Sequence, residues 1–326
     1  MSLVRSILKM AAALAAAVIL SPTLASAGAP DTSVVEMFPK GVSQISYLDL
    51  KTARQLPWFS VAEQKLLPLR LRKLEVFLSG AGLDVETQVD TLAWGTVSAT
   101  KTDGEGIVGV ATGSFSPSTV ENYFSQHNLP TLDQQGVHLL NIGGAPNDLF
   151  LVFLDPGTVA FGERVALEQL LAVHFKGSES LAENLILFPP IRDTRQDSLI
   201  WTVWNRDYAR AALQQLLPQA AQVPQAALLL NDIQSMEFDV ADPDNLSARS
   251  EIICSSPTEA VTLSALLQAG IVYRKYESAR SGSQASSIFE GIRVSAYSSR
   301  VEIEIPLGPD QLDSALRSGN VLNLLQ

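Results

Sequence analysis

The chain has 326 residues, of which 46% are hydrophobic, and a formal net charge of −11 at neutral pH. This length suits two domains of ordinary size. The acidic balance argues against binding to nucleic acid, which rewards clusters of Lys and Arg, and anionic membrane surfaces repel such a chain.

The first 27 residues have the pattern of a bacterial signal peptide. Arg5 and Lys9 precede an apolar run from Ala11 to Leu20, and Ala25-Ser26-Ala27 is a small-residue cleavage site. The run is shorter than the roughly 20 residues that a membrane-spanning helix needs, so we expect no stable membrane insertion. We predict cleavage after Ala27, a periplasmic or secreted protein, and a mature chain whose net charge is −13 once Arg5 and Lys9 are removed.

Residues 28–176 are predicted to form a first α+β repeat. Ser116 and Pro117 suit the N-cap and first turn of a helix, and Ser79-Gly80-Ala81-Gly82 suits a helix end. Alternating apolar residues predict strands over 42–50, 91–100, 107–115, 137–142, 149–154 and 158–161, and helical spacing predicts helices over 66–78 and 165–175.

Residues 177–197 are predicted to be a linker, and 198–326 a second α+β repeat. In it we expect strands over 199–204, 233–240, 246–254, 292–297 and 301–305, and helices over 208–217 and 310–316. Ser256 and Glu259 form a capping box that opens a further helix, with Val261, Leu266 and Leu267 facing inward. The serine-rich stretch 278–287 is a candidate mobile loop.

The two halves share a sequence layout. Residues 116–120 correspond to 256–260, 45–49 to 201–205, and 136–139 to 291–294, in the same order along the chain. This internal repeat predicts an α+β fold of two tandem repeats, each a mostly antiparallel sheet with helices packed on one face, as in a ferredoxin-like plait with extra strands.

Gly82-Leu83-Asp84, followed by Val89-Asp90-Thr91-Leu92, together with the leader and the repeated unit, resembles a group of exported bacterial proteins of unknown function. The resemblance covers most of the mature chain. It implies an exported protein with a duplicated α+β unit, and it brings no catalytic residues to this sequence.

Few residues suggest a metal-binding or catalytic role. Asp239, Asp242 and Asp244, with Asn245, crowd one turn and are candidate ligands for a hard cation such as Ca²⁺, although turns also favour these residues. Glu302 and Glu304 share one face of a predicted strand, where a solvated face gives the same pattern. Cys254 lies in a strand with no base nearby in the sequence, so we expect a buried, unreactive thiol.

The three histidines, His127, His138 and His174, have no zinc-binding spacing, and no Gly-x-Ser-x-Gly elbow or phosphate-binding loop occurs. We therefore predict no catalytic residues and no cofactor. The sequence favours a non-catalytic binding or interaction module of the bacterial cell envelope, whose partner is an envelope protein or a small ligand. The alternative is an extracytoplasmic hydrolase with dispersed acid–base residues.

Overall fold

A computed structural model describes residues 32–56, 69–100, 104–134, 136–142, 149–195, 197–216, 229–241, 247–281 and 291–306. The described residues divide into two compact units: the first holds residues 32–53 and 69–188, and the second holds residues 54–56 and those from Pro189 onward. The predicted signal peptide and the helix predicted over 310–316 lie outside the described residues.

The predicted fold class is wrong. The twelve strands of the described part belong to a single sheet, with the order β11-β12-β10-β9-β8-β1-β2-β3-β7-β6-β5-β4, rather than to two repeats that each carry a sheet of their own. Seven of these strands lie in the first unit and five in the second. Hydrophobic periodicity specifies where strands occur but not which strand edges are joined, because edge N–H and C=O groups look alike for every residue type.

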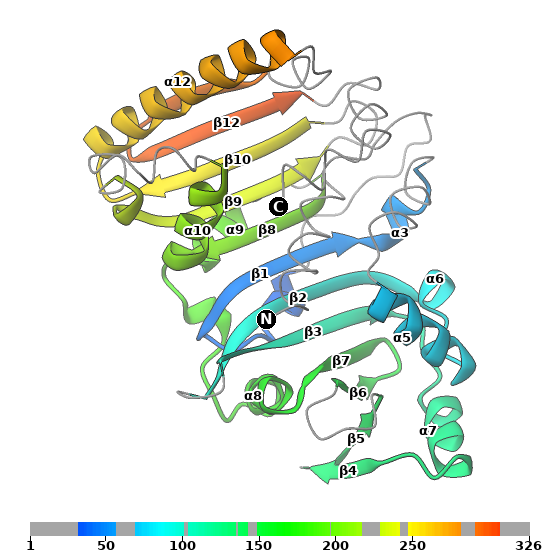
Figure 1. Cartoon of the computed structure of the whole chain (residues 1–326). Helices are drawn as coiled ribbons and strands as arrows, with labels where there is room; N and C mark the ends of the chain where they lie inside the picture. The colour runs from blue at the N-terminus through cyan, green and yellow to red at the C-terminus, as the bar shows by residue number, and fades with distance from the viewer. Residues whose placement is uncertain are drawn as a thin grey trace. The chain divides into compact units, whose positions relative to one another are not determined.

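The first unit alternates short helices with a meandering antiparallel sheet (Figure 1). Helix α8 packs on β2, β3, β6 and β7, and its buried Leu167, Leu170 and Leu171 supply that contact. The elements are α2 (Thr32–Val35), β1 (Val42–Asp49), α3 (Leu50–Ala53), α5 (Leu69–Gly80), α6 (Val85–Gln88), β2 (Val89–Thr100), β3 (Gly104–Gly113), α7 (Pro117–Gln126), β4 (Thr131–Gln134), β5 (Val137–Asn141), β6 (Leu149–Asp155), β7 (Thr158–Glu163), α8 (Arg164–His174) and η1 (Leu181–Glu183).

The helix boundaries of this unit follow the predicted signals. Helix α5 ends at Gly80, and Gly82 has φ +85°, so the amide of Leu83 reaches the carbonyl oxygen of Leu78 at 2.8 Å. Helix α7 begins at Pro117 with Ser116 at its N-cap, although the Ser116 side chain makes no capping hydrogen bond. Both predicted positions are confirmed, and Pro117 accounts for the second because it lacks an N–H that would need a partner.

The second unit places its apolar core between the sheet and two helices, α10 and α12, which Figure 1 shows beside the strands they contact. Its elements are α9 (Phe188–Asp193), which begins at the boundary between the units, β8 (Ser198–Asn205), α10 (Arg206–Leu216), β9 (Ile233–Ala241), β10 (Ser247–Cys254), α12 (Pro257–Ser281), β11 (Arg293–Tyr297) and β12 (Arg300–Pro306). The five predicted strands of this half are confirmed to within one or two residues at either end.

Helix α12 departs from its prediction in two ways. Its buried face carries Ala260, Leu263 and Leu267, whereas Val261, predicted to point inward, is exposed. The helix also continues to Ser281, four residues into the stretch predicted to be a mobile loop. The short helices η1 and α9 lie within the segment 177–197 that the sequence predicts as a linker.

Close packing in the first unit makes Gly113 a position where a small change has a large expected effect. A Cβ atom there would lie 1.8 Å from the carbonyl oxygen of Gln88, so the backbone would have to move. We expect Gly113→Ala to lower the free energy of unfolding by about 2 kcal/mol, measured by urea denaturation. Gly41→Ala, where a Cβ meets nothing within 4 Å, is the matched control; equal effects of the two substitutions would contradict the packing seen here.

Candidate functional site

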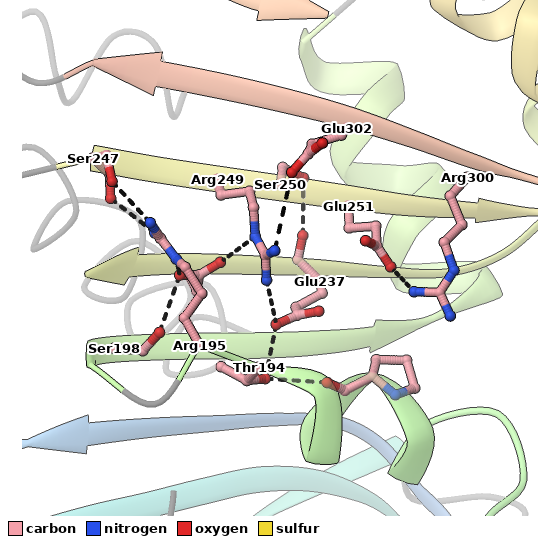
Figure 2. A network of polar contacts seen from close by, with 12 residues as sticks. Thr194, Arg195, Ser198, Glu237, Ser247, Arg249, Ser250, Glu251, Arg300 and Glu302 are labelled. Carbon is pink, nitrogen blue, oxygen red and sulfur yellow. Dashed lines mark hydrogen bonds and ion pairs between the residues drawn. The ribbon is translucent and has the colours of Figure 1, made fainter. Parts of the chain in front are cut away.

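One face of the second unit's sheet is lined with charged side chains instead of apolar ones. Strand alternation turns Met236, Ile252 and Val301 toward the helices and their core, and turns their neighbours toward the opposite face. The residues that follow this alternation on the opposite face are Glu237, Asp239, Arg249, Glu251, Arg300, Glu302 and Glu304, and several of them are joined in the network of Figure 2. We call this set, with Thr194 and Arg195, the charged face.

The strand register places these residues in rows. In one row, Asp239 of β9 lies opposite Arg249 of β10, which lies opposite Glu304 of β12, which lies opposite Arg293 of β11. This row alternates acid and base across four strands, the arrangement that cross-strand pairing favours.

The next row carries like charges. Glu237 lies opposite Glu251, and Glu251 lies opposite Glu302. Like charges directly opposite one another are destabilising unless cations or protons intervene. The flanking arginines, Arg249 and Arg300, supply the cations, and Arg300 Nη1 contacts Glu251 Oε1.

Asp239 is the most deeply buried charge of the face, with 1% of its surface exposed. Arg195 Nε donates to its Oδ2 at 2.5 Å, Arg249 Nε donates to its Oδ1 at 3.1 Å, and the Ser198 hydroxyl donates to Oδ2 at 3.0 Å. A buried carboxylate needs partners of this kind, because its desolvation otherwise costs several kcal/mol.

Of the three candidate cation ligands, only Asp239 lies among the described residues. Asp242 and Asp244, like Asn245, lie outside the described residues, and Asp239 holds two guanidinium groups. The described residues contain no cluster of three or more His, Cys, Asp or Glu side chains suited to a metal ion.

Glu237 occupies a different environment from Asp239. It is 3% exposed, and burial raises its pKa from 4.5 to about 7, reinforced by the nearby carboxylates of Asp239 and Glu251 and opposed by Thr194 and Arg249. Thr194 Oγ1 lies 2.7 Å from Glu237 Oε1 and 3.1 Å from the carbonyl oxygen of Pro190. The Thr194 hydroxyl carries one proton, so it donates to Glu237 or to Pro190 but not to both at once.

Glu251 is also hydrogen-bonded to Tyr297 of β11. Tyr297 Oη donates to Glu251 Oε2 at 3.1 Å, beside the contact between Glu251 and Arg300. Burial and the neighbouring Glu251 raise the pKa of Tyr297, so the phenol stays protonated and acts as a donor.

A pocket of about 230 Å³ opens beside the row of alternating charges. Three arginines line it: Arg195 from the turn before β8, Arg249 from β10 and Arg293 from β11. The remaining lining residues are Ser247, Ala248, Gly291, Glu304 and Ile305. Figure 2 shows Arg195 reaching Ser247, whose hydroxyl accepts a hydrogen bond from Arg195 Nη1 at 2.8 Å.

The other residues singled out in the sequence lie away from this pocket. All three histidines are exposed, and His138 contacts Asp133 whereas His127 contacts the carbonyl oxygen of Tyr123. Cys254 is buried, as predicted, and burial raises the pKa of its thiol to about 11.

Sequence reasoning found Glu302 and Glu304 on one strand face but missed Glu237, Arg249 and Thr194. A signal was present, because charged residues occupy alternate positions of both strands of a predicted hairpin, 237 and 239 in one and 249 and 251 in the other. Such alternation is typical of a solvated face. The structure shows instead that Glu237, Asp239 and Glu251 are buried.

Comparison with known proteins shows a likeness of fold. No protein-family model matches the sequence, and no curated protein matches it. A structure of TP0453, crystal form I, is similar over 88% of this chain and 96% of that chain, with a TM-score of 0.51 and 10% sequence identity. Crystal form III of TP0453 is similar over 87% of this chain and 97% of that chain, with a TM-score of 0.51 and 8% sequence identity. Function therefore has to be argued from the site itself.

Proposed function

We propose that this protein is an exported, non-catalytic binding module of the bacterial cell envelope, and that the pocket of the second unit is a binding site. The N-terminal pattern of Arg5, Lys9, an apolar run and Ala25-Ser26-Ala27 supports export. The resemblance to exported bacterial proteins of unknown function agrees with this assignment. Within the described residues, no helix is long and apolar enough to cross a membrane.

The proposal that this pocket binds a ligand rests on the side chains that line it. Three guanidinium groups are donors that stay protonated at any physiological pH, so they bind acceptors but take up no proton. The lining hydroxyl, Ser247, is bonded to Arg195, a partner unable to act as its base. The lining carboxylate, Glu304, faces Arg293 across 3.9 Å. This arrangement suits recognition of a ligand.

Export and binding are tested in the bacterium with a tagged full-length chain. We expect the mature protein to begin near Gly28 by mass spectrometry and to appear in the periplasmic or secreted fraction. A photo-crosslinking amino acid at Arg293, in the pocket wall, is expected to capture an envelope component or a small ligand. The same probe at Leu185, which is 89% exposed in the first unit, is the matched control.

Two outcomes would overturn the proposal. An unprocessed chain retained in the cytoplasm would contradict export. Turnover of ester, amide or glycoside substrates by the purified chain, abolished by Ser247→Ala, would favour the alternative of an extracytoplasmic hydrolase.

A further inference from the structure

Helix α12 is apolar on two opposite sides. One side packs on the sheet through Ala260, Leu263 and Leu267, which are buried in the core of the second unit. The other side is exposed, and its uncharged residues recur every three or four positions, which places them on one side of the helix. We call this set the outer stripe: Val261, Ala265, Ala269, Val272 and Tyr276.

The outer stripe is too long and too exposed to be ordinary surface. Val261, Val272 and Tyr276 are 61%, 65% and 61% exposed. At 1.5 Å per residue the stripe extends for about 22 Å along α12. A helix that is apolar all round is normally buried on both sides, and a continuous exposed apolar surface marks an interaction site.

Helix α12 and strand β12 run in the same direction (Figure 1). The backbone N–H of Cys254, just before α12, donates to the carbonyl oxygen of Ser299, just before β12, at 2.8 Å. The two elements therefore begin side by side. Their ends point toward the same edge of the second unit.

The chain leaves β12 beside the second half of α12. Gln268 Nε2 donates to the carbonyl oxygen of Val294 at 2.9 Å, and Val294 lies opposite Ile303 of β12. From Ile303 to the end of the strand at Pro306 is about 10 Å, a distance that α12 covers in about seven residues beyond Gln268. Residue 307 therefore follows a point level with Tyr276.

The sequence after β12 suits a return along the helix. Residues 307–326 lie outside the described residues, but their pattern is informative. Pro306-Leu307-Gly308-Pro309 is rich in turn residues, which favours reversal of the chain. The helix predicted over 310–316 carries Leu312, Ala315 and Leu316 on one side. Twenty residues are more than enough to cover a stripe of about 22 Å.

The charges of the two segments are complementary. Residues 271–281 of α12 carry three basic side chains and one acidic one, whereas residues 307–326 carry two acidic and one basic. Asp310 and Asp313 come early in the second segment, and Arg280 lies at the end of α12, with its Cζ 5.9 Å from the centre of the Tyr276 ring. Opposite charges thus occur where the chain would reach α12 first, which favours docking in this direction.

We propose that residues 307–326 fold back antiparallel to α12 and cover its outer stripe, with Leu312 and Leu316 packed on Val272 and Tyr276. The outer side of α12 is then a docking surface for an amphipathic segment of the same chain. This inference goes beyond the proposed function and does not depend on the pocket.

The test is photo-crosslinking of the purified mature chain in dilute solution, with p-benzoylphenylalanine in place of Val272. We expect mass spectrometry to find the crosslink within residues 307–326, in a product that migrates as a single chain. The matched control is the same probe at Val76, a valine of α5 in the first unit that is 73% exposed. It should give no crosslink to residues 307–326, because the docked segment is held on α12.

Two double variants show whether the contact is apolar. Leu312→Asp with Leu316→Asp is expected to lower the yield of the Val272 crosslink at least about tenfold, because burying each leucine favours docking by more than a factor of ten. Gln311→Asp with Ser314→Asp adds the same charge away from the leucine side of the predicted helix and should leave the yield unchanged. Circular dichroism checks that both variants are folded.

Three results would overturn the proposal. A Val272 crosslink that joins two chains would show that a second copy covers the stripe. Equal yields in the two double variants would show that residues 307–326 are near α12 without docking through their leucines. A Val272 probe that captures nothing from residues 307–326 would show that this segment does not cover the stripe.

Discussion

Replacing Asp239 with asparagine is expected to lower the free energy of unfolding by about 3–5 kcal/mol, the cost of leaving a buried charge without its partner. The substitution keeps the size of the side chain but removes the negative charge that Arg195 and Arg249 share. It also presents an amide N–H₂ group to one of the two donors. Urea denaturation of the mature chain at neutral pH measures the loss.

A double substitution distinguishes a charge effect from a packing effect. Asp239→Leu with Arg249→Met removes both partners, so the double variant should lose less stability than the sum of the two single variants. The control is the exposed pair Lys40–Glu179, whose side chains are 44% and 64% exposed, where Glu179→Gln should cost no more than about 1 kcal/mol. A loss for Asp239→Asn as small as the control would contradict the buried network.

The local elements of this protein could be predicted from its sequence, and their assembly could not. The strands around Trp201, Phe238 and Ile252 are evident because apolar and β-branched residues mark them, and Pro117 and Gly82 mark helix ends. The single sheet was missed because strand-edge pairing depends on backbone groups that every residue shares. Val261 was misplaced because one apolar residue at helical spacing does not determine which side of a helix is buried.

The candidate site, too, could be predicted from the sequence only in part. Thr194 and Glu237 are 43 residues apart, and Arg195 and Ser247 are 52 apart, so their contacts follow from the strand register and from the position of the turn before β8. The alternation of charges in β9 and β10 was visible in the sequence, but it does not reveal burial. Burial is the property that raises the pKa of Glu237 and makes Asp239 dependent on two arginines.

Stability is expected to fall between pH 5 and pH 8 because of Glu237. Its pKa is raised to about 7 in the folded protein from an ordinary value of 4.5, so the folded state binds a proton that the unfolded state has already released. The stabilisation is fully present below about pH 4.5 and is lost as the pH rises through about 7. At 1.36 kcal/mol per pKa unit, the contribution that disappears is about 3 kcal/mol, most of it between pH 5 and pH 8.

Glu237→Gln isolates this effect from other titrating groups. The groups facing Glu237 are Thr194 after α9, Asp239 on the same strand, and Arg249 and Glu251 on β10, and all of them remain in the variant. The amide carries no proton-linked charge, so the stability of Glu237→Gln relative to the wild type should improve by about 2–3 kcal/mol from pH 5 to pH 8, measured by urea denaturation at each pH. Parallel curves for the two proteins would show that Glu237 titrates alike in the folded and unfolded states. A divergence confined to this window would establish that the folded protein holds a proton on Glu237 that the unfolded chain has released.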